Sequence, residues 1–303
     1  MANIIAVIWD FDKTLVDGYM QDPIFQHYGV DAKAFWREVN ALPDKYMREQ
    51  QVRVNRDTIY LNHFIQGAHD GRFPGLNNAL LRSFGKDLRF YPGVPDIFPK
   101  TKALIAQNAA YQEYDIKVEH YIVSTGMTQV IRGSSVMEHV DGVWGCELIE
   151  REVDGAPIIS EVGYTIDNTS KTRAIFEINK GVPKHPEIDV NSPMPEALRR
   201  VPFEHMIYIA DGPSDIPAFS LVNKNGGATF AIYPKGDREA FRQIEQMRRD
   251  GRVHMYAEAD YTEGTTAYMW ITNKIEEFAE GIRRREKATL TASLSAVPRH
   301  LHL

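Results

Sequence analysis

Near its amino terminus the chain reads Ile4-Ile5-Ala6-Val7-Ile8-Trp9-Asp10-Phe11-Asp12-Lys13-Thr14. The first six of these residues are apolar without alternation, which is typical of a parallel strand covered on both faces. Two carboxylates follow at once, so Asp10 and Asp12 leave the end of this strand together. Ligands of open α/β sheets bind beyond the carboxyl ends of the strands. The stretch therefore predicts a buried central strand with a polar site at its end.

Further apolar runs have the same character. They are Tyr121–Val123 before Ser124, Met206–Ala210 before Asp211, and Ala228–Ile232 before Tyr233. Helical patterns lie between these runs, at residues 100–110, 171–179 and 238–249. Strands that alternate with helices favour an α/β fold built on a doubly wound parallel sheet.

Residues 17–91 differ from the rest of the chain, because they are rich in aromatic side chains, helical in pattern and free of a strand-like run. We expect a smaller helical cap domain here, inserted after the first strand into a catalytic core of residues 1–16 and 92–285. Serine, threonine and alanine accumulate without a period in residues 286–303, which predicts a disordered tail.

Composition narrows the functional classes. A content of 43% hydrophobic and 25% charged residues is ordinary for a globular protein, and the net charge of -6 argues against nucleic-acid and anionic-membrane partners. The single cysteine, Cys146, excludes an intramolecular disulfide and a thiolate metal cluster. The run Ile4–Ile8 is too short for a membrane span or a signal-peptide core. We expect a cytoplasmic protein, and the sequence leaves its oligomeric state open.

Two polar motifs follow the first two strand runs. In Asp10-x-Asp12, one carboxylate can attack phosphorus while the other reaches the bridging oxygen of a phosphate ester. In Ser124-Thr125-Gly126, a hydroxyl and backbone amides at a helix start can hold phosphoryl oxygens. A solvated turn and a plain helix N-cap are the alternatives for the two motifs taken singly.

Two more motifs lie later in the chain. Lys171 falls in the first turn of a predicted helix, where a cation is unfavourable against the helix dipole and so indicates an anionic partner. Asp211 and Asp215, separated by a turn that contains Gly212, suit a magnesium ion held by few protein ligands and several waters. The alternative for this pair is an Asx turn that caps a helix.

Asp10-x-Asp12-x-Thr14, Ser124, Lys171 and the Asp211/Asp215 pair resemble, in order and placement, the haloacid dehalogenase (HAD) superfamily, in particular its phosphoserine phosphatase-like branch. The resemblance covers residues 1–16 and 92–235, and the helical insertion falls where that family places a cap. It implies an Mg²⁺-dependent phosphatase that hydrolyses a small phosphorylated metabolite through an aspartyl-phosphate. An aspartate at position 12 argues against a dehalogenase or a P-type ATPase.

The resemblance also implies a role for each motif residue. Asp10 would be the nucleophile and Asp12 the general acid and base. Ser124, Thr125 and Lys171 would bind phosphate oxygens, and Thr14 would fix the turn that presents Asp12. Mg²⁺ would be held by Asp10, the backbone carbonyl of Asp12, Asp211 and Asp215.

Several alternatives share parts of this pattern. A phosphotransferase or phosphomutase would have the same core, and a non-catalytic module would bind a phosphorylated ligand without turnover. A signalling receiver domain places its acidic pair near the first strand and its phosphorylated aspartate later, which is the reverse of this order. Arg48, Arg53 and Arg56 of the insertion are either contacts for a second anionic group of the substrate or a solvated helix face.

Overall fold

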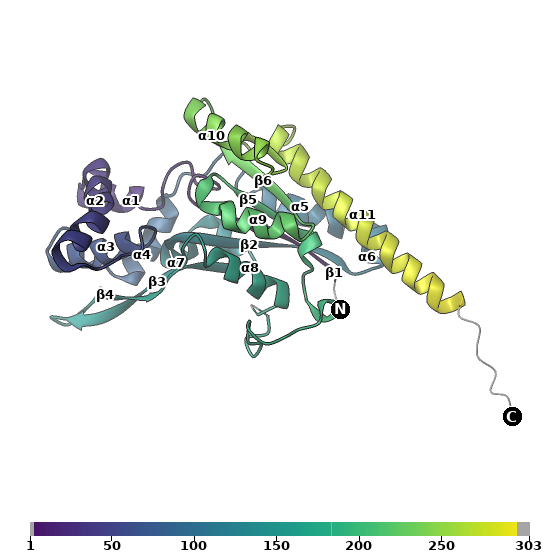
Figure 1. Cartoon of the computed structure of the whole chain (residues 1–303), viewed down its shortest axis with the longest axis horizontal. Helices are drawn as coiled ribbons and strands as arrows, with labels where there is room; N and C mark the ends of the chain where they lie inside the picture. Colours follow the sequence, from purple (N-terminus) through teal and green to yellow (C-terminus); the bar gives the residue numbers. More distant parts are fainter. Residues whose placement is uncertain (1–2, 183, 296–303) are drawn as a thin grey trace.

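The computed structural model of the protein describes residues 3–182 and 184–295. Over these residues the core is a seven-stranded sheet in the order β4-β3-β2-β1-β5-β6-β7 (Figure 1). Every strand pair is parallel except β3 with β4, which form an antiparallel hairpin. The predicted α/β fold with a mainly parallel sheet is confirmed. The strands are β1 (Asn3–Trp9), β2 (Ile116–Met127), β3 (Gly142–Val153), β4 (Ala156–Tyr164), β5 (Met206–Ala210), β6 (Ala228–Tyr233) and β7 (Met255–Glu258).

Helices cover both faces of the sheet. Alternate residues of β1 point to opposite faces, and because all of them from Ile4 to Trp9 are apolar, both faces must be covered. Ile5, Val7 and Trp9 belong to one hydrophobic cluster, and Ile4, Ala6 and Ile8 to the other. The first cluster includes α5 (Ile97–Ala106), α6 (Ala109–Gln112) and α11 (Thr266–Ser295). The second includes α8 (Lys171–Lys180), α9 (Ile216–Lys224) and α10 (Arg238–Arg249). The continuous apolar run of β1 is therefore explained by burial on both faces.

The helices of residues 17–91, for which we keep the name cap, lie together at one end of the molecule, beside the β3–β4 hairpin (Figure 1). They are α1 (Asp22–Tyr28), α2 (Ala32–Gln50), α3 (Ile59–His69) and α4 (Asn78–Phe84), followed by the 3-10 turn η1 (Gly85–Asp87). The aromatic rings of Phe25, Phe35, Phe64 and Phe73 pack on one another at their centre. The two connections to the core run side by side, since Asp17 N bonds Arg89 O at 2.8 Å and Tyr91 N bonds Leu15 O at 2.9 Å.

The structure corrects two expectations. The second strand does not end at Ser124 but runs on to Met127, where it pairs with Cys146 of β3. Residues 286–295 are not a disordered tail, because they continue helix α11 to Ser295. Residues 296–303 lie outside the described part of the chain. Within that part, no helix has the length and apolar character needed to cross a membrane.

Short 3-10 turns occupy several connections around the sheet. They are η2 (Ser135–Glu138), η3 (Glu196–Leu198), η4 (Phe203–His205) and η5 (Pro213–Asp215). The last of these follows β5 directly and ends on Asp215, one of the predicted site residues.

Gly133 marks the contact between the cap and the core. It follows α7 (Thr128–Arg132), and a Cβ built on it would lie 1.6 Å from the backbone oxygen of Arg82 in α4. Neither backbone can move without separating the two helices. We expect Gly133→Ala to lower the free energy of unfolding by about 3 kcal/mol, at the upper end of overpacking effects. Urea denaturation followed by circular dichroism measures this change.

Gly281→Ala is the matched control, because a Cβ at Gly281 in α11 meets nothing within 4 Å outside its own helix. It should leave stability unchanged or raise it by up to about 1 kcal/mol, as expected for alanine in a helix. Equal effects of the two substitutions would contradict the proposed contact.

His120 of β2 is fully buried behind Trp9, the residue that precedes Asp10. The indole N–H of Trp9 donates to His120 Nδ1 at 3.1 Å. His120 Nε2 lies 2.9 Å from Thr101 Oγ1, whose own proton goes to the carbonyl of Ile97. Nδ1 therefore accepts, Nε2 carries the proton, and the ring is neutral. Burial, together with the charge of Lys102, lowers the pKa of His120 to about 3.

This arrangement predicts acid sensitivity. The folded pKa of His120 lies below its unfolded value, so the unfolded chain takes up the proton first as the pH falls. The contribution of the neutral His120 ring to the free energy of unfolding is fully present above about pH 6.5. It falls as the pH falls, by about 3 kcal/mol at about pH 4. His120→Asn keeps an acceptor for Trp9 and should flatten the pH profile of urea unfolding. His69→Asn, at an exposed histidine, should leave it unchanged.

Candidate active site

Three chain segments meet beyond the carboxyl ends of the two central strands. β1 pairs with β5, so Asp10 after Trp9 and Asp211 after Ala210 emerge side by side. Lys171 is the first residue of α8 and Asp215 the last of η5. Residues from three of the four motifs that the sequence marked thus converge on one site, which is expected when parallel strands end at the same sheet edge.

Lys171 lies at the centre of this site. Its ammonium donates to Asp10 Oδ1 and to Asp215 Oδ1, each at 2.7 Å, and its side chain is only 1% exposed. Asp215 Oδ1 also accepts from the hydroxyl of Tyr208 at 2.6 Å. Tyr208 was not identified from the sequence, where it is one aromatic residue of a strand. Its hydroxyl holds Asp215 in place from inside the sheet.

The two aspartates after β1 are held by different groups. Thr14 Oγ1 donates to Asp10 Oδ2 at 3.1 Å, so Thr14 orients the predicted nucleophile. The backbone N–H of Met20 donates to Asp12 Oδ1 at 2.8 Å. The side chain of Thr14 thus contacts Asp10, and the segment leading into the cap holds Asp12. The expectation that Thr14 fixes the turn that presents Asp12 stays a prediction.

Asp10, Asp211 and Asp215 can share a metal ion. Each offers a carboxylate oxygen, and these oxygens lie within 4.8 Å of one another. A cluster of hard oxygen ligands suits Mg²⁺, which keeps several waters besides one or two carboxylates. The side chain of Asp12 does not belong to this group, in agreement with a role for its backbone carbonyl alone. The donor set therefore fits the predicted ion.

The electrostatics of the site also call for a further cation. Burial, reinforced by Asp215 and opposed by Lys171, raises the pKa of Asp10 to about 6. Burial and the charge of Asp10 raise the pKa of Asp211 to about 8. The same two causes raise the pKa of Asp12 well above its usual range. One buried lysine cannot balance this many carboxylates, and a divalent ion bound by Asp10 and Asp211 would lower the pKa values of these two ligands again.

Ser124 and Thr125 lie in the last part of β2. Ser124 is buried, and its Oγ accepts the backbone N–H of Gly126 at 3.0 Å, so its own proton remains available to a ligand. The carbonyl of Thr125 accepts from Tyr60 at 2.9 Å and from Cys146 at 3.3 Å. No hydrogen bond joins either side chain to Asp10 or Lys171 among the described residues. Their binding of phosphate stays a prediction.

Two of the contacts between the cap and the core lie near the site and were not indicated by the sequence. The Tyr60 hydroxyl bonds Thr125, as above, and Asn55 Nδ2 donates to Asp167 Oδ2 at 2.8 Å. Asp57 accepts from the backbone N–H of Asn168 at 3.3 Å. Asp167 and Asn168 lie just before Lys171, so the residues 55–57 close over the helix that carries the buried lysine.

The cap arginines lie elsewhere. Arg48, Arg53 and Arg56 are all exposed, and Arg56 forms a solvent-exposed ion pair with Asp44 at 3.7 Å. In this arrangement of the cap they form part of a solvated surface. Exposed pairs of this kind contribute little to stability.

Comparison with known proteins finds a relative that covers most of the chain. No family model matches the chain. An uncharacterized protein of Borreliella burgdorferi is 38% identical over 287 residues, which cover 90% of this chain and 97% of that one. The chain therefore belongs to the same family as that protein.

Solved structures identify the fold. A HAD family hydrolase from Salmonella enterica subsp. enterica serovar Typhi superimposes with a TM-score of 0.51 at 14% identity, over 84% of this chain and 67% of that one. The protein has the haloacid dehalogenase fold. A gene product of Archaeoglobus fulgidus also superimposes with a TM-score of 0.51, at 15% identity, over 99% of this chain and 89% of that one.

Asp10, Lys171, Asp211 and Asp215 lie together at the carboxyl ends of the strands. The predicted superfamily fold is confirmed. The finer assignment to a phosphoserine phosphatase-like branch stays a prediction, as do the roles of the individual residues.

Proposed function

We propose that this protein is an Mg²⁺-dependent phosphatase that hydrolyses a small phosphate ester in the cytoplasm through an aspartyl-phosphate on Asp10. The observation that supports this most is the convergence of Asp10, Lys171, Asp211 and Asp215 at one sheet edge, with Asp12 beside them. The HAD fold supports the same function. The closed cap favours a small substrate, because it limits the space above the site.

In the first half-reaction, a carboxylate oxygen of Asp10 attacks phosphorus and the bond from phosphorus to the ester oxygen breaks. Lys171 and Thr14 hold the two oxygens of this carboxylate and fix its orientation. Asp12 gives its proton to the departing alcohol. Its raised pKa favours the protonated form that this step requires.

In the second half-reaction, water attacks the phosphorus of the aspartyl-phosphate. Asp12, now a carboxylate, takes the proton from that water, and Asp10 and inorganic phosphate are released. When bound by Asp10, the Asp12 carbonyl, Asp211 and Asp215, Mg²⁺ would neutralise charge between the anionic nucleophile and the anionic phosphoryl group. The Ser124 hydroxyl and the Lys171 ammonium would bind the non-bridging oxygens.

Release of phosphate from p-nitrophenyl phosphate and from a panel of phosphorylated metabolites tests this function. Hydrolysis should require Mg²⁺ and stop when EDTA is added. Transfer of the phosphoryl group to an added alcohol or sugar, with little free phosphate, would instead favour a phosphotransferase or phosphomutase. Absence of both reactions in Mg²⁺-loaded protein would contradict catalysis by this site.

A further inference from the structure

A hollow lies away from the candidate active site, on the outer side of α8. One wall is a stripe of α8 side chains, and the other is the irregular segment before η4. We call this hollow of about 640 Å³ the α8 groove; it is lined by Thr172, Arg173, Phe176, Lys180, Val190, Asn191, Ser192, Pro193, Met194 and Arg199. Its volume is in the range of sites that bind drug-sized ligands.

The α8 groove is cationic in a protein of net charge -6. Three of its lining residues are basic and none is acidic. Lys180 is buried and donates to the carbonyls of Val190 and Ser192 rather than to a carboxylate, which also holds the second wall in place. Arg173 is paired with Glu177 on the helix at 3.0 Å.

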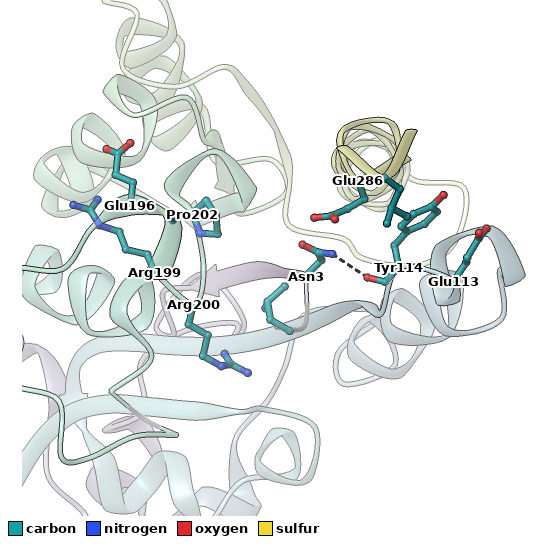
Figure 2. Close-up of a pocket in the computed structure, with 11 residues that line it drawn as sticks. Asn3, Glu113, Tyr114, Glu196, Arg199, Arg200, Pro202 and Glu286 are labelled. Carbon is teal, nitrogen blue, oxygen red and sulfur yellow. Dashed lines mark hydrogen bonds between the residues drawn. The ribbon is translucent and has the colours of Figure 1, made fainter. Parts of the chain in front are cut away.

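Arg199 has no such partner. Its Nε is shielded from solvent and has no hydrogen-bond acceptor among residues 3–182 and 184–295, and no ion pair of this side chain occurs there either. A buried guanidinium N–H without an acceptor is costly and rare in folded proteins. Its neighbour Arg200 instead binds Glu119, and Figure 2 shows the two side chains extending to different sides of their segment. Among the three cations of the α8 groove, Arg199 is therefore the one whose guanidinium an anionic ligand would satisfy.

The neighbouring hollow of Figure 2 is less suited to an anion. Arg199 borders it too, but Glu113, Glu196 and Glu286 also line it. The α8 groove in contrast offers an apolar surface beside its cations. Phe176 is 37% exposed, held edge-on by Phe203 with the ring centroids 5.3 Å apart. A flat ring can pack on this face while an acid group binds the guanidinium in a bidentate manner.

We propose that the α8 groove binds a small organic anion that joins a flat aromatic or heteroaromatic ring to one acidic group. A nucleoside monophosphate and an aromatic carboxylate both have this chemistry. The site is separate from the proposed phosphatase reaction, and its test does not depend on that reaction. Because α8 begins at Lys171, an occupant would bind the helix that carries the buried lysine of the active site.

Isothermal titration calorimetry with naphthalenesulfonate, in EDTA, tests the proposal. We expect saturable binding of one molecule per chain with a Kd of about 0.1–1 mM, which is ordinary for a ligand of this size. Naphthalenemethanol, which keeps the ring but lacks the charge, should bind about tenfold more weakly or not at all. Displacement by adenosine monophosphate or by naphthoate would support the site and indicate which kind of occupant it prefers.

Variants locate the binding. Arg199→Gln and Phe176→Ser should each weaken it about tenfold. Tyr114→Ala, which alters the hollow of Figure 2 but no residue of the α8 groove, and Arg238→Gln, at an exposed arginine of α10, should not. Thermal melts check that each variant is folded. Absence of saturable binding at about 10 mM probe, or binding that is lost in Tyr114→Ala and retained in Phe176→Ser, would overturn the proposal.

Discussion

Asp10→Asn is expected to reduce kcat/KM for p-nitrophenyl phosphate by about 10⁴-fold or more, since removal of a covalent nucleophile removes the pathway itself. An amide oxygen is a poor nucleophile and cannot form the acyl phosphate. The shape of the side chain is kept, so Lys171 and Thr14 retain a partner at position 10. Steady-state kinetics with saturating Mg²⁺ measures the loss.

The fold should survive this substitution. Asp10 shares its site with several other acids, and removal of one negative charge relieves part of the repulsion that raises their pKa values. The stability of Asp10→Asn in EDTA should thus stay within about 1 kcal/mol of wild type. Asp44→Asn, at an exposed cap residue, is the control and should keep full activity. A folded Asp10→Asn protein with more than about a hundredth of wild-type activity would show that Asp10 is not the nucleophile.

Lys171→Met is expected to have the largest effect on stability. Methionine fills a similar volume but leaves Asp10 and Asp215 buried without their cation. Removal of one partner from a buried ion pair lowers the free energy of unfolding by about 3–5 kcal/mol. Phosphatase activity should fall as well, because the same ammonium is proposed to bind the phosphoryl oxygens. Urea denaturation in EDTA at about pH 8 measures the stability, and Lys117→Met, which breaks an exposed pair with Asp115, should cost less than about 1 kcal/mol.

The pH dependence distinguishes this loss of charge from a simple packing defect. Burial already raises the pKa of Asp10 to about 6, and loss of Lys171 would raise it further. A carboxyl group with a raised folded pKa contributes stability at low pH, and this contribution is lost as the pH rises through that pKa. The deficit of Lys171→Met should therefore shrink when the pH falls from about 8 to about 5. A deficit that is independent of pH would contradict the electrostatic explanation.

Local patterns predicted the elements that surround the site. The run from Ile4 to Trp9 predicted a strand buried on both faces, with the following carboxylates at the strand end, and the structure confirms this strand. The apolar pattern did not predict where the second strand ends. Ser124, Thr125 and Gly126 are polar or small and lie where the pairing with β3 is irregular, and the strand ends only at Met127, which pairs with Cys146 of β3. The position of β3 depends on the whole sheet.

The end of the last helix was also misjudged, for a similar reason. Serine, threonine and alanine after residue 286 show no apolar period, yet the helix continues to Ser295. Ala279 and Ile282 are buried against the core and anchor the earlier turns. A helix that is already nucleated extends at little cost through residues of modest propensity.

The sequence by itself determined the strand that carries Asp10, the order of the four motifs and the kind of chemistry that carboxylates and a lysine can perform. Only the tertiary structure decided which groups touch. Lys171 reaches Asp10 across 161 positions of the chain, and Asn55 reaches Asp167 across 112. The partners of Asp215, and the lack of an acceptor for Arg199 Nε among the described residues, were likewise settled by folding. Periodicity and propensity act over a few neighbouring residues, whereas these contacts exist only once the sheet has brought distant segments to one edge.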